Sequence, residues 1–176
     1  SPIIDAVEDI TAEVNGLTGG NTTALTDNDT LNDVLVVIGS APGNVTLTGT
    51  TIPDGFILNQ DSTVTIPANT PAGDYEVEYQ ICEVNNPLNC DSATATIVVS
   101  APIIDAVEDI TEPINGLTGG NTDSLTGNDT LNGDPVVIGT QPGDVTLTGL
   151  NVPLGFTLNP NGTVTVPANT PAGAYE

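Results

Sequence analysis

The sequence predicts an all-β protein built from two tandem β-sandwich domains. Short runs rich in Val, Ile, Leu and Thr recur about every 8 to 12 residues, and Gly, Pro, Asn and Asp separate them. No stretch shows the periodicity of an amphipathic helix. The second observation is a unit of 100 residues that occurs twice, which is the signature of a modular array.

The repeat defines the expected domains. Residues 1–10 return almost unchanged at 101–110, and the register holds without a gap to the end of the chain. Roughly 53 of the 76 aligned positions are identical, as in arrays that stack one structural unit. We therefore expect a complete domain over residues 1–100 and a second domain over residues 101–176 that lacks its last strands.

Alternating apolar and polar residues locate the strands of the first copy. Val64 and Ile66 alternate with threonines, and Tyr75, Val77 and Tyr79 alternate with polar residues, which gives each strand one apolar and one wet face. Pro and Gly mark the turns between them. We expect strands near residues 3–8, 12–17, 34–39, 44–49, 55–59, 62–66, 74–82 and 92–99.

The second copy contains no counterpart of residues 77–100, which in the first copy are expected to form the last hairpin. A β-sandwich without these strands exposes an apolar groove and unpaired edges. One hypothesis is that a neighbouring subunit donates the strands, which would give head-to-tail filaments. The other is that residues beyond Glu176 supply them within a longer tandem array.

Composition excludes several classes of partner. The chain has no Lys, Arg or His against 23 acidic residues, for a formal charge of −23. Such a surface repels nucleic acid and anionic membranes. No apolar run approaches the roughly 20 residues that span a bilayer, so direct membrane insertion is not expected. Divalent ions or glycans would screen this charge, which favours an extracellular or cell-surface location.

The two cysteines, Cys82 and Cys90, lie in strand-like sequence on either side of a predicted turn. Without histidine or a second cysteine pair, a zinc site is not expected. We predict a disulfide that closes the hairpin, which is typical of secreted proteins. The alternative is a pair of free thiols.

The motifs DAVEDI, LTDNDTLN and the closing stretch PANTPAGDYEVEYQICEVNNPLNCDSATATIVV resemble the tandem Ig-like, cadherin-like repeats of large surface and secreted proteins of Bacteroidota. The resemblance covers the first copy and as much of the second as is present, although the second lacks most of the closing motif. It implies an immunoglobulin-like sandwich that serves as a building block of adhesins and surface fibres. It also implies no enzymatic activity and identifies no ligand.

The residues themselves offer little for catalysis. No His or Lys can serve as a base, no Arg can bind an anion, and the cysteines are expected to be paired, so a nucleophilic triad cannot be assembled. A pair of carboxylates could serve a glycosidase or an aspartic protease. However, the acidic residues sit at repeated positions, which favours an architectural role. We expect no enzymatic activity and no required cofactor.

Calcium is the one ion that the acidic clusters suggest. Oxygen ligands on loops at a domain junction suit calcium, which stiffens tandem sandwiches. The alternative is that Asp and Asn serve turn geometry through local hydrogen bonds. The candidate ligands are Asp5, Glu8, Asp9, Asp27 and Asp29 in the first copy, and Asp105, Glu108, Asp109 and Asp129 in the second, where Gly127 replaces Asp27.

Glycosylation is the last candidate chemistry. Asp followed by Ser or Thr and then by an apolar residue or Thr occurs more often than composition alone predicts, and it matches an O-glycosylation motif associated with Bacteroidota. The alternative is that these are ordinary turn residues. The candidate O-linked acceptors are Thr30, Ser62, Ser92, Ser124 and Thr130, and lower-ranked N-linked sequons begin at Asn21, Asn28, Asn44, Asn128 and Asn161.

Two hypotheses of function follow. In the first, the chain is a structural, non-enzymatic repeat of an extracellular bacterial filament or fibre that binds copies of itself and carries glycans. In the second, it is a stalk segment of a large, calcium-stiffened cell-surface adhesin whose binding domain lies elsewhere. The mass of the intact protein separates the two.

Overall fold

The computed structural model describes residues 2–176 and is all-β, as the sequence predicts. The chain divides into two compact units, Ser1–Ala101 and Pro102–Glu176, called unit 1 and unit 2 below. This boundary lies one residue beyond the one expected from the repeat. Among the described residues the only helix is η1, a 3-10 turn over Leu25–Asn28, so none of the described helices could cross a membrane.

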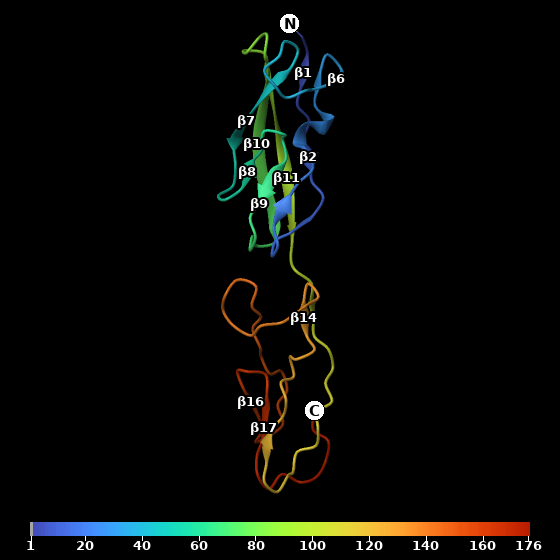
Figure 1. Ribbon diagram of the computed structural model, residues 1–176, viewed down its shortest axis with the longest axis vertical. Coiled ribbons are helices and arrows are strands. Elements are labelled where there is room, and N and C mark those ends of the chain that lie inside the picture. Colours follow the sequence, from blue (N-terminus) through green and yellow to red (C-terminus); the bar gives the residue numbers. More distant parts are fainter. Residues whose placement is uncertain (1) are drawn as a thin grey trace. The chain divides into compact units, whose positions relative to one another are not determined.

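Unit 1 contains three antiparallel or mixed sheets (Figure 1). The largest has the strand order β2-β11-β10-β7, and β3 also pairs with β11. The two smaller sheets have the orders β1-β5-β6 and β4-β9-β8. The strands are β1 Ile4–Asp5, β2 Asp9–Ile10, β3 Val14–Asn15, β4 Gly20–Asn21, β5 Thr30–Leu31, β6 Val34–Leu35, β7 Val45–Thr51, β8 Ile57–Leu58, β9 Val64–Ile66, β10 Gly73–Glu83 and β11 Cys90–Ser100.

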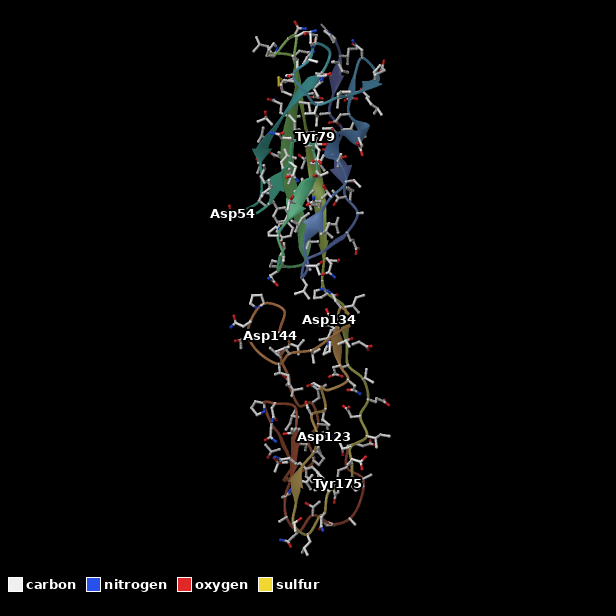
Figure 2. All side chains as sticks on the ribbon, viewed as in Figure 1. Asp54, Tyr79, Asp123, Asp134, Asp144 and Tyr175 are labelled. Carbon is white, nitrogen blue, oxygen red and sulfur yellow. A yellow bond between two sulfur atoms is a disulfide. The ribbon has the colours of Figure 1, made fainter. Side chains whose placement is uncertain are left out.

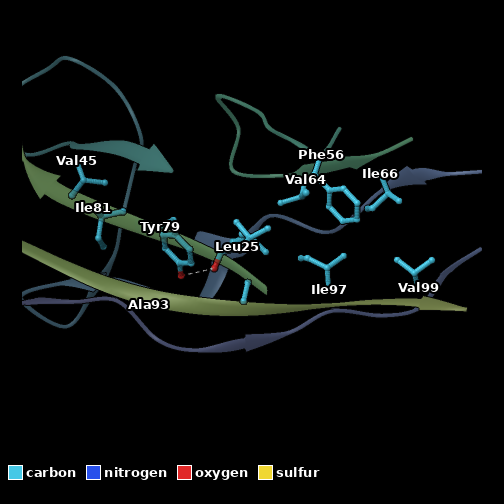
Figure 3. Close-up of a cluster of buried hydrophobic side chains, with 12 residues drawn as sticks. Leu25, Val45, Phe56, Val64, Ile66, Tyr79, Ile81, Ala93, Ile97 and Val99 are labelled. Carbon is cyan, nitrogen blue, oxygen red and sulfur yellow. Dashed lines mark hydrogen bonds between the residues drawn. The ribbon is translucent and has the colours of Figure 1, made fainter. Parts of the chain in front are cut away.

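The hairpin of β10 and β11 is the centre of unit 1. The two strands pair in one continuous antiparallel register from Gly73↔Val99 to Cys82↔Cys90. Their alternating sequence buries one face, as the alternation predicts. Seven of the twelve residues of the core cluster come from this hairpin: Val77, Tyr79, Ile81, Ala93, Ala95, Ile97 and Val99. Leu25, Val45, Phe56, Val64 and Ile66 pack against them from the rest of the unit (Figure 3).

The predicted disulfide is confirmed. Cys82 and Cys90 are the last paired residues of β10 and β11 and are bonded to each other. The bridge therefore closes the tip of the hairpin, where Glu83 N also donates to Asn89 O at 3.0 Å.

Several strands differ from the expected ranges. The runs at 3–8 and 12–17 form only the two-residue strands β1, β2 and β3. Strand β1 pairs antiparallel with β5, whereas β2 and β3 pair parallel with β11. Because the segment changes partner between β1 and β2, each pairing is brief. The run at 34–39 is also short, because only Ile38 bridges Val45 beyond β6. Strand β4 lies in sequence rich in Gly and Asn, and β5 lies between Asn28 and Asn32; neither segment shows alternation.

Unit 2 repeats the two small sheets of unit 1 but has no counterpart of the large one. Its sheets have the orders β12-β14-β15 and β13-β17-β16. Their registers match unit 1 position for position, as in Ile104↔Leu131 against Ile4↔Leu31. The strands are β12 Ile104–Asp105, β13 Gly120–Asn121, β14 Thr130–Leu131, β15 Asp134–Pro135, β16 Thr157–Leu158 and β17 Val164–Val166.

Candidate assembly site on the second unit

Unit 2 presents apolar residues that unit 1 buries. Among residues 102–176, all of which the structure describes, no apolar side chain is buried. The counterparts of the non-hairpin core residues of unit 1 are all half-buried: Leu125, Val145, Phe156, Val164 and Val166. We call these five side chains the open face. The corresponding five side chains of unit 1 pack against the β10–β11 hairpin.

The edges beside the open face also lack pairing. In unit 1, β7 pairs with β10 from Val45↔Glu83 to Thr51↔Glu78, whereas residues 146–151 form no strand. Similarly, β2 and β3 pair with β11, and residues 109–110 and 114–115 form no strand. Unpaired backbone groups at an edge are a template for an added strand. Unit 2 therefore offers two edges and one apolar face to the same kind of strand pair.

Tyr175, at the end of the described residues, has the contacts of its counterpart Tyr75 in unit 1. Tyr175 packs on Phe156 with ring centroids 4.8 Å apart, and its hydroxyl donates to Pro171 O at 2.8 Å. In unit 1 the corresponding Tyr75 packs on Phe56 at 4.9 Å and donates to Pro71 O at 2.8 Å. Figure 2 labels Tyr175 of unit 2 and Tyr79 of unit 1. Tyr79 has no counterpart among residues 102–176.

Tyr79 occupies the most polar position in the core of unit 1. Its side chain is completely buried, and its hydroxyl lies near five oxygen atoms. These are Val7 O at 3.3 Å, Asp9 Oδ2 at 3.2 Å, Leu25 O at 3.3 Å, and Asp29 Oδ1 and Oδ2 at 3.2 and 3.1 Å. Figure 3 shows the contact with Leu25. Because a phenol has one proton, it can donate to only one of them at a time.

The pKa values of Asp9, Asp29 and Tyr79 are all raised. Burial raises the pKa of Asp29 to about 6, against the lowering effect of hydrogen bonds from Val7 N and Tyr79. Burial likewise raises the pKa of Asp9, and the pKa of Tyr79 lies well above its usual range for the same reason. The cluster therefore favours neutral side chains when the face is covered.

The backbone around η1 holds Asp29 in place. The amide of Asp29 donates to Thr26 O at 3.3 Å, and the amide of Val36 donates to Asp29 O at 3.1 Å. The amide of Val7 donates to Asp29 Oδ1 at 2.8 Å and ties the first strand segment to the turn. The carboxylate is thus held by a backbone amide on one side and by the Tyr79 hydroxyl of the hairpin on the other.

In unit 2 the same backbone contacts hold Asp129, the counterpart of Asp29, although residues 102–176 contain no counterpart of Tyr79. Val107 N donates to Asp129 Oδ1 at 2.8 Å, Asp129 N to Thr126 O at 3.4 Å, and Val136 N to Asp129 O at 3.2 Å. Asp129 is half-buried and Asp109 is exposed, whereas Asp29 is completely buried. We call Asp129, Asp109 and the carbonyls of Val107 and Leu125 the acceptor set of unit 2, because their counterparts surround Tyr79 in unit 1.

The acidic residues predicted as calcium ligands do not form one site. The structure brings Asp9 and Asp29 together on Tyr79, while Asp5, Glu8 and Asp27 are exposed. In unit 2, Asp105, Glu108 and Asp109 are exposed. Within residues 2–176, no three acidic or cysteine side chains gather in an arrangement that could hold a metal ion.

Two of the predicted O-linked acceptors have structural roles. Ser62 is completely buried, and its Oγ lies 2.8 Å from Thr26 Oγ1 and accepts from Thr26 N at 3.3 Å. A glycan on this hydroxyl would break both contacts, so Ser62 is not accessible in the folded unit. Gly162 replaces it in unit 2, where Ser124 supplies the hydroxyl instead: its Oγ lies 3.1 Å from Thr126 Oγ1 and accepts from Thr126 N at 3.4 Å.

The other candidate acceptors lie nearer the surface. Ser92 is exposed on β11, where its Oγ accepts from Gln80 Nε2 at 3.3 Å, and Thr30 and Thr130 are half-buried on β5 and β14. Of the N-linked candidates, Asn44 is half-buried. The remaining four are exposed: Asn21, Asn28, Asn128 and Asn161.

Comparison of the chain with protein-family models found no match, and comparison with curated proteins found none either.

Proposed function

We propose that this chain is a structural, non-enzymatic repeat of an extracellular fibre, whose units are completed by strand pairs of the β10–β11 type. One observation carries the proposal: unit 2 repeats the two small sheets of unit 1 in the same register, as in a tandem array of one structural unit. Added strands gain affinity from main-chain hydrogen bonds and specificity from alternate side chains. A unit that repeats in tandem is suited to a linear array.

The occupant of the open face must come from outside residues 102–176. Residues 2–176 contain one such hairpin and two faces that fit it. We propose that a hairpin with the chemistry of residues 77–100 covers this face, whether it follows in the same chain or comes from another copy.

Two other features support an extracellular setting. The Cys82–Cys90 disulfide closes the strand pair that completes a unit, and such bonds persist in oxidising compartments. The charge of −23 keeps assembled units soluble and disfavours side-by-side association. Glycans on exposed hydroxyls such as that of Ser92 would add to this surface. In this proposal calcium has no required role.

Electron microscopy of the native material tests the proposal. The protein would be purified from its source, identified by mass spectrometry of its peptides, and imaged in negative stain. We expect filaments with a regular axial repeat. Dispersed particles at all concentrations would contradict the fibre, and an intact mass far above 18 kDa would assign the repeats to one long chain.

A further inference from the structure

We propose that the outer edge of β7 in unit 1 is a docking site for an extended, basic segment of another protein, which pairs with this strand through its backbone. The edge belongs to unit 1 and does not involve the open face of unit 2. A protein bound there would be a second kind of component on the chain, which goes beyond the proposed structural role.

The direction of the backbone groups of β7 follows from the contacts of its first residue. Val45 N donates to Val37 O at 2.9 Å, and Gly39 N donates to Val45 O at 3.0 Å, so both backbone groups of Val45 face away from β10. Residues of an antiparallel strand alternate between the two directions. Leu47 and Gly49 therefore also present their N–H and C=O groups to the outer side of the sheet.

These outer groups have no strand beside them. β7 is the last strand of the large sheet, and Figure 1 labels it at the left side of unit 1. Apart from the bridge between Ile38 and Val45, no residue within the described range 2–176 pairs with this edge. The strand also contains neither proline nor lysine, which native proteins use to block edges. It is therefore a template for an added strand.

The regular part of the edge is short. The register between β7 and β10 shifts between Glu78 and Tyr79, which lie opposite Thr51 and Gly49, so the regular pairing ends at Gly49. A segment that pairs with the outer groups of Leu47 and Gly49 uses all of it. The site therefore fits a short extended segment better than a whole sheet.

The core side of this edge is apolar. A Cβ atom at Gly49 would lie 2.6 Å from Ile52 Cδ1 and 3.3 Å from Leu58 Cδ2, so these two side chains lie against the strand there. Ile52 is 38% exposed, and Leu47 and Leu58 are half-buried. An added strand would cover these side chains with apolar residues at its own inward positions.

The solvent side of the edge is polar and acidic. Thr48 is exposed, and Thr51 Oγ1 donates to Oε2 of the exposed Glu78 at 2.7 Å. Asp54 is exposed in the turn that follows β7, and Figure 2 labels it at the margin of unit 1. The chain has no Lys, Arg or His to pair with these carboxylates. Charge complementarity therefore favours a partner with Lys or Arg, whereas a second copy would bring only negative charge.

The geometry of pairing defines the pattern of the partner. In an antiparallel pair, the residues opposite Leu47 and Gly49 exchange both hydrogen bonds with them and place their side chains on the same face. The residues that bond to β7 are therefore the apolar, inward-facing ones. The basic residues lie between them, point to the solvent side and have amides that face away from β7.

The test uses the full chain and a short, capped peptide of alternating valine and lysine. Two derivatives have the same charge: in one the valine amides are N-methylated, and in the other the lysine amides are. We expect methylation of the valine amides to weaken binding about tenfold more than methylation of the lysine amides, because only the former removes bonds to β7. The same peptide with glutamate in place of lysine should not bind.

Two further measurements locate the site. In amide exchange followed by NMR, the peptide should protect the amides of Leu47 and Gly49 and leave that of Thr48 unchanged, because the Thr48 amide faces β10. Glu78→Gln should weaken binding of the lysine peptide about threefold at low salt. Glu13→Gln is the matched control, since this exposed carboxylate lies between β2 and β3 at the opposite edge of the sheet.

Four results would overturn the docking site. Equal binding of the two methylated peptides would show that charge alone attracts them, and absence of binding by the lysine peptide would remove the site altogether. Binding of the glutamate peptide with equal affinity would exclude a basic partner. A dimer of the chain alone, with Leu47 and Gly49 protected, would assign the edge to a second copy. All of these are measured at unit 1, so they leave the fibre proposal to its own test.

Discussion

The hydroxyl of Tyr79 lies 3.1 Å from Oδ2 of Asp29, and both residues are completely buried in unit 1. The tyrosine comes from the hairpin, and the aspartate comes from the turn after η1. Their contact joins the strand pair to the rest of the unit through a polar group inside an apolar core. Unit 2 contains the corresponding Asp129, which accepts from Val107 N as Asp29 accepts from Val7 N.

Tyr79→Phe should destabilise unit 1 by about 1–3 kcal/mol, because the buried oxygen atoms around the hydroxyl lose the one proton that it donates to them. Native-state hydrogen exchange of the β11 amides in urea measures this free energy of unfolding. Tyr75→Phe is the matched control, since it removes a hydroxyl whose bond to Pro71 O is exposed. An equal loss of unfolding free energy in the two variants would show that the buried Tyr79–Asp29 contact stabilises unit 1 no more than the exposed bond of Tyr75 does.

The stability of unit 1 should fall as pH rises from about 4 to above 6. The pKa of Asp29 is about 6 in the folded state and about 3.9 in the unfolded chain, so the folded state binds more protons in this window. The loss amounts to at most about 3 kcal/mol. The loss of stability should be complete above the pKa of Asp29 in the folded state and absent below its pKa in the unfolded chain. The raised pKa of Asp9 acts in the same direction.

Unfolding of the Asp29→Asn variant between pH 4 and pH 8 tests this assignment. The amide keeps an acceptor for Val7 N but does not titrate, so the dependence on pH should flatten. Asp54→Asn, which removes one exposed charge, controls for net charge. If Asp29→Asn keeps the full slope of the parent chain, the buried carboxyl is not its source.

Exchange of the Ser62 hydroxyl for one at position 24 should preserve the contact with Thr26. Ser62→Gly alone should cost about 1 kcal/mol, because two buried hydrogen bonds are lost while the strain of a positive φ of 63° is relieved. Adding Ala24→Ser should restore most of this, since unit 2 uses Ser124 with Gly162. A side chain at position 162 would collide with Ser124 Oγ, so Ala24→Ser without Ser62→Gly should not stabilise unit 1.

Thermal or urea unfolding of the four chains in this cycle measures the coupling between positions 24 and 62. We expect the double variant to be more stable than the sum of the single effects predicts. Additive effects would mean that the two hydroxyls are not interchangeable.

Replacing both cysteines by serine should lower the free energy of unfolding of unit 1 by about 2–3 kcal/mol, because the bridge restricts a short loop in the unfolded chain. The hairpin tip should lose protection first, beginning with the bond from Glu83 N to Asn89 O. Hydrogen exchange at this amide and global urea unfolding check both effects. Unchanged stability would mean that the Cys82–Cys90 disulfide does not stabilise unit 1.

The long strands could be predicted from the sequence because their signal is local. Alternation from Tyr75 to Ile81 specifies both the strand and its buried face, and the cysteines lie at the ends of paired strands. The segment from residue 3 to residue 17 could not be resolved in the same way. Its short strands depend on which neighbour each residue meets, first β5 and then β11, and that is a property of the tertiary fold.

The candidate site was only partly accessible to sequence reasoning. The repeat alignment showed that residues 77–100 have no counterpart among residues 101–176, but no pattern in the sequence indicated that Asp9 and Asp29 converge on Tyr79. The residues of that cluster are separated by up to 72 positions, so no local motif reveals it. One signal was present: Tyr79 is the only tyrosine of the first copy without a counterpart in the second.

The central claim is that unit 2 has the fold of unit 1 and requires only a strand pair to complete it. The most direct test appends the sequence of residues 77–100 after Glu176 and measures amide hydrogen exchange in residues 145–151. We predict protection equal to that of β7 in unit 1, against rapid exchange in the parent chain. Rapid exchange in the extended chain would contradict the account, because the open face would then not accept the strands that it matches.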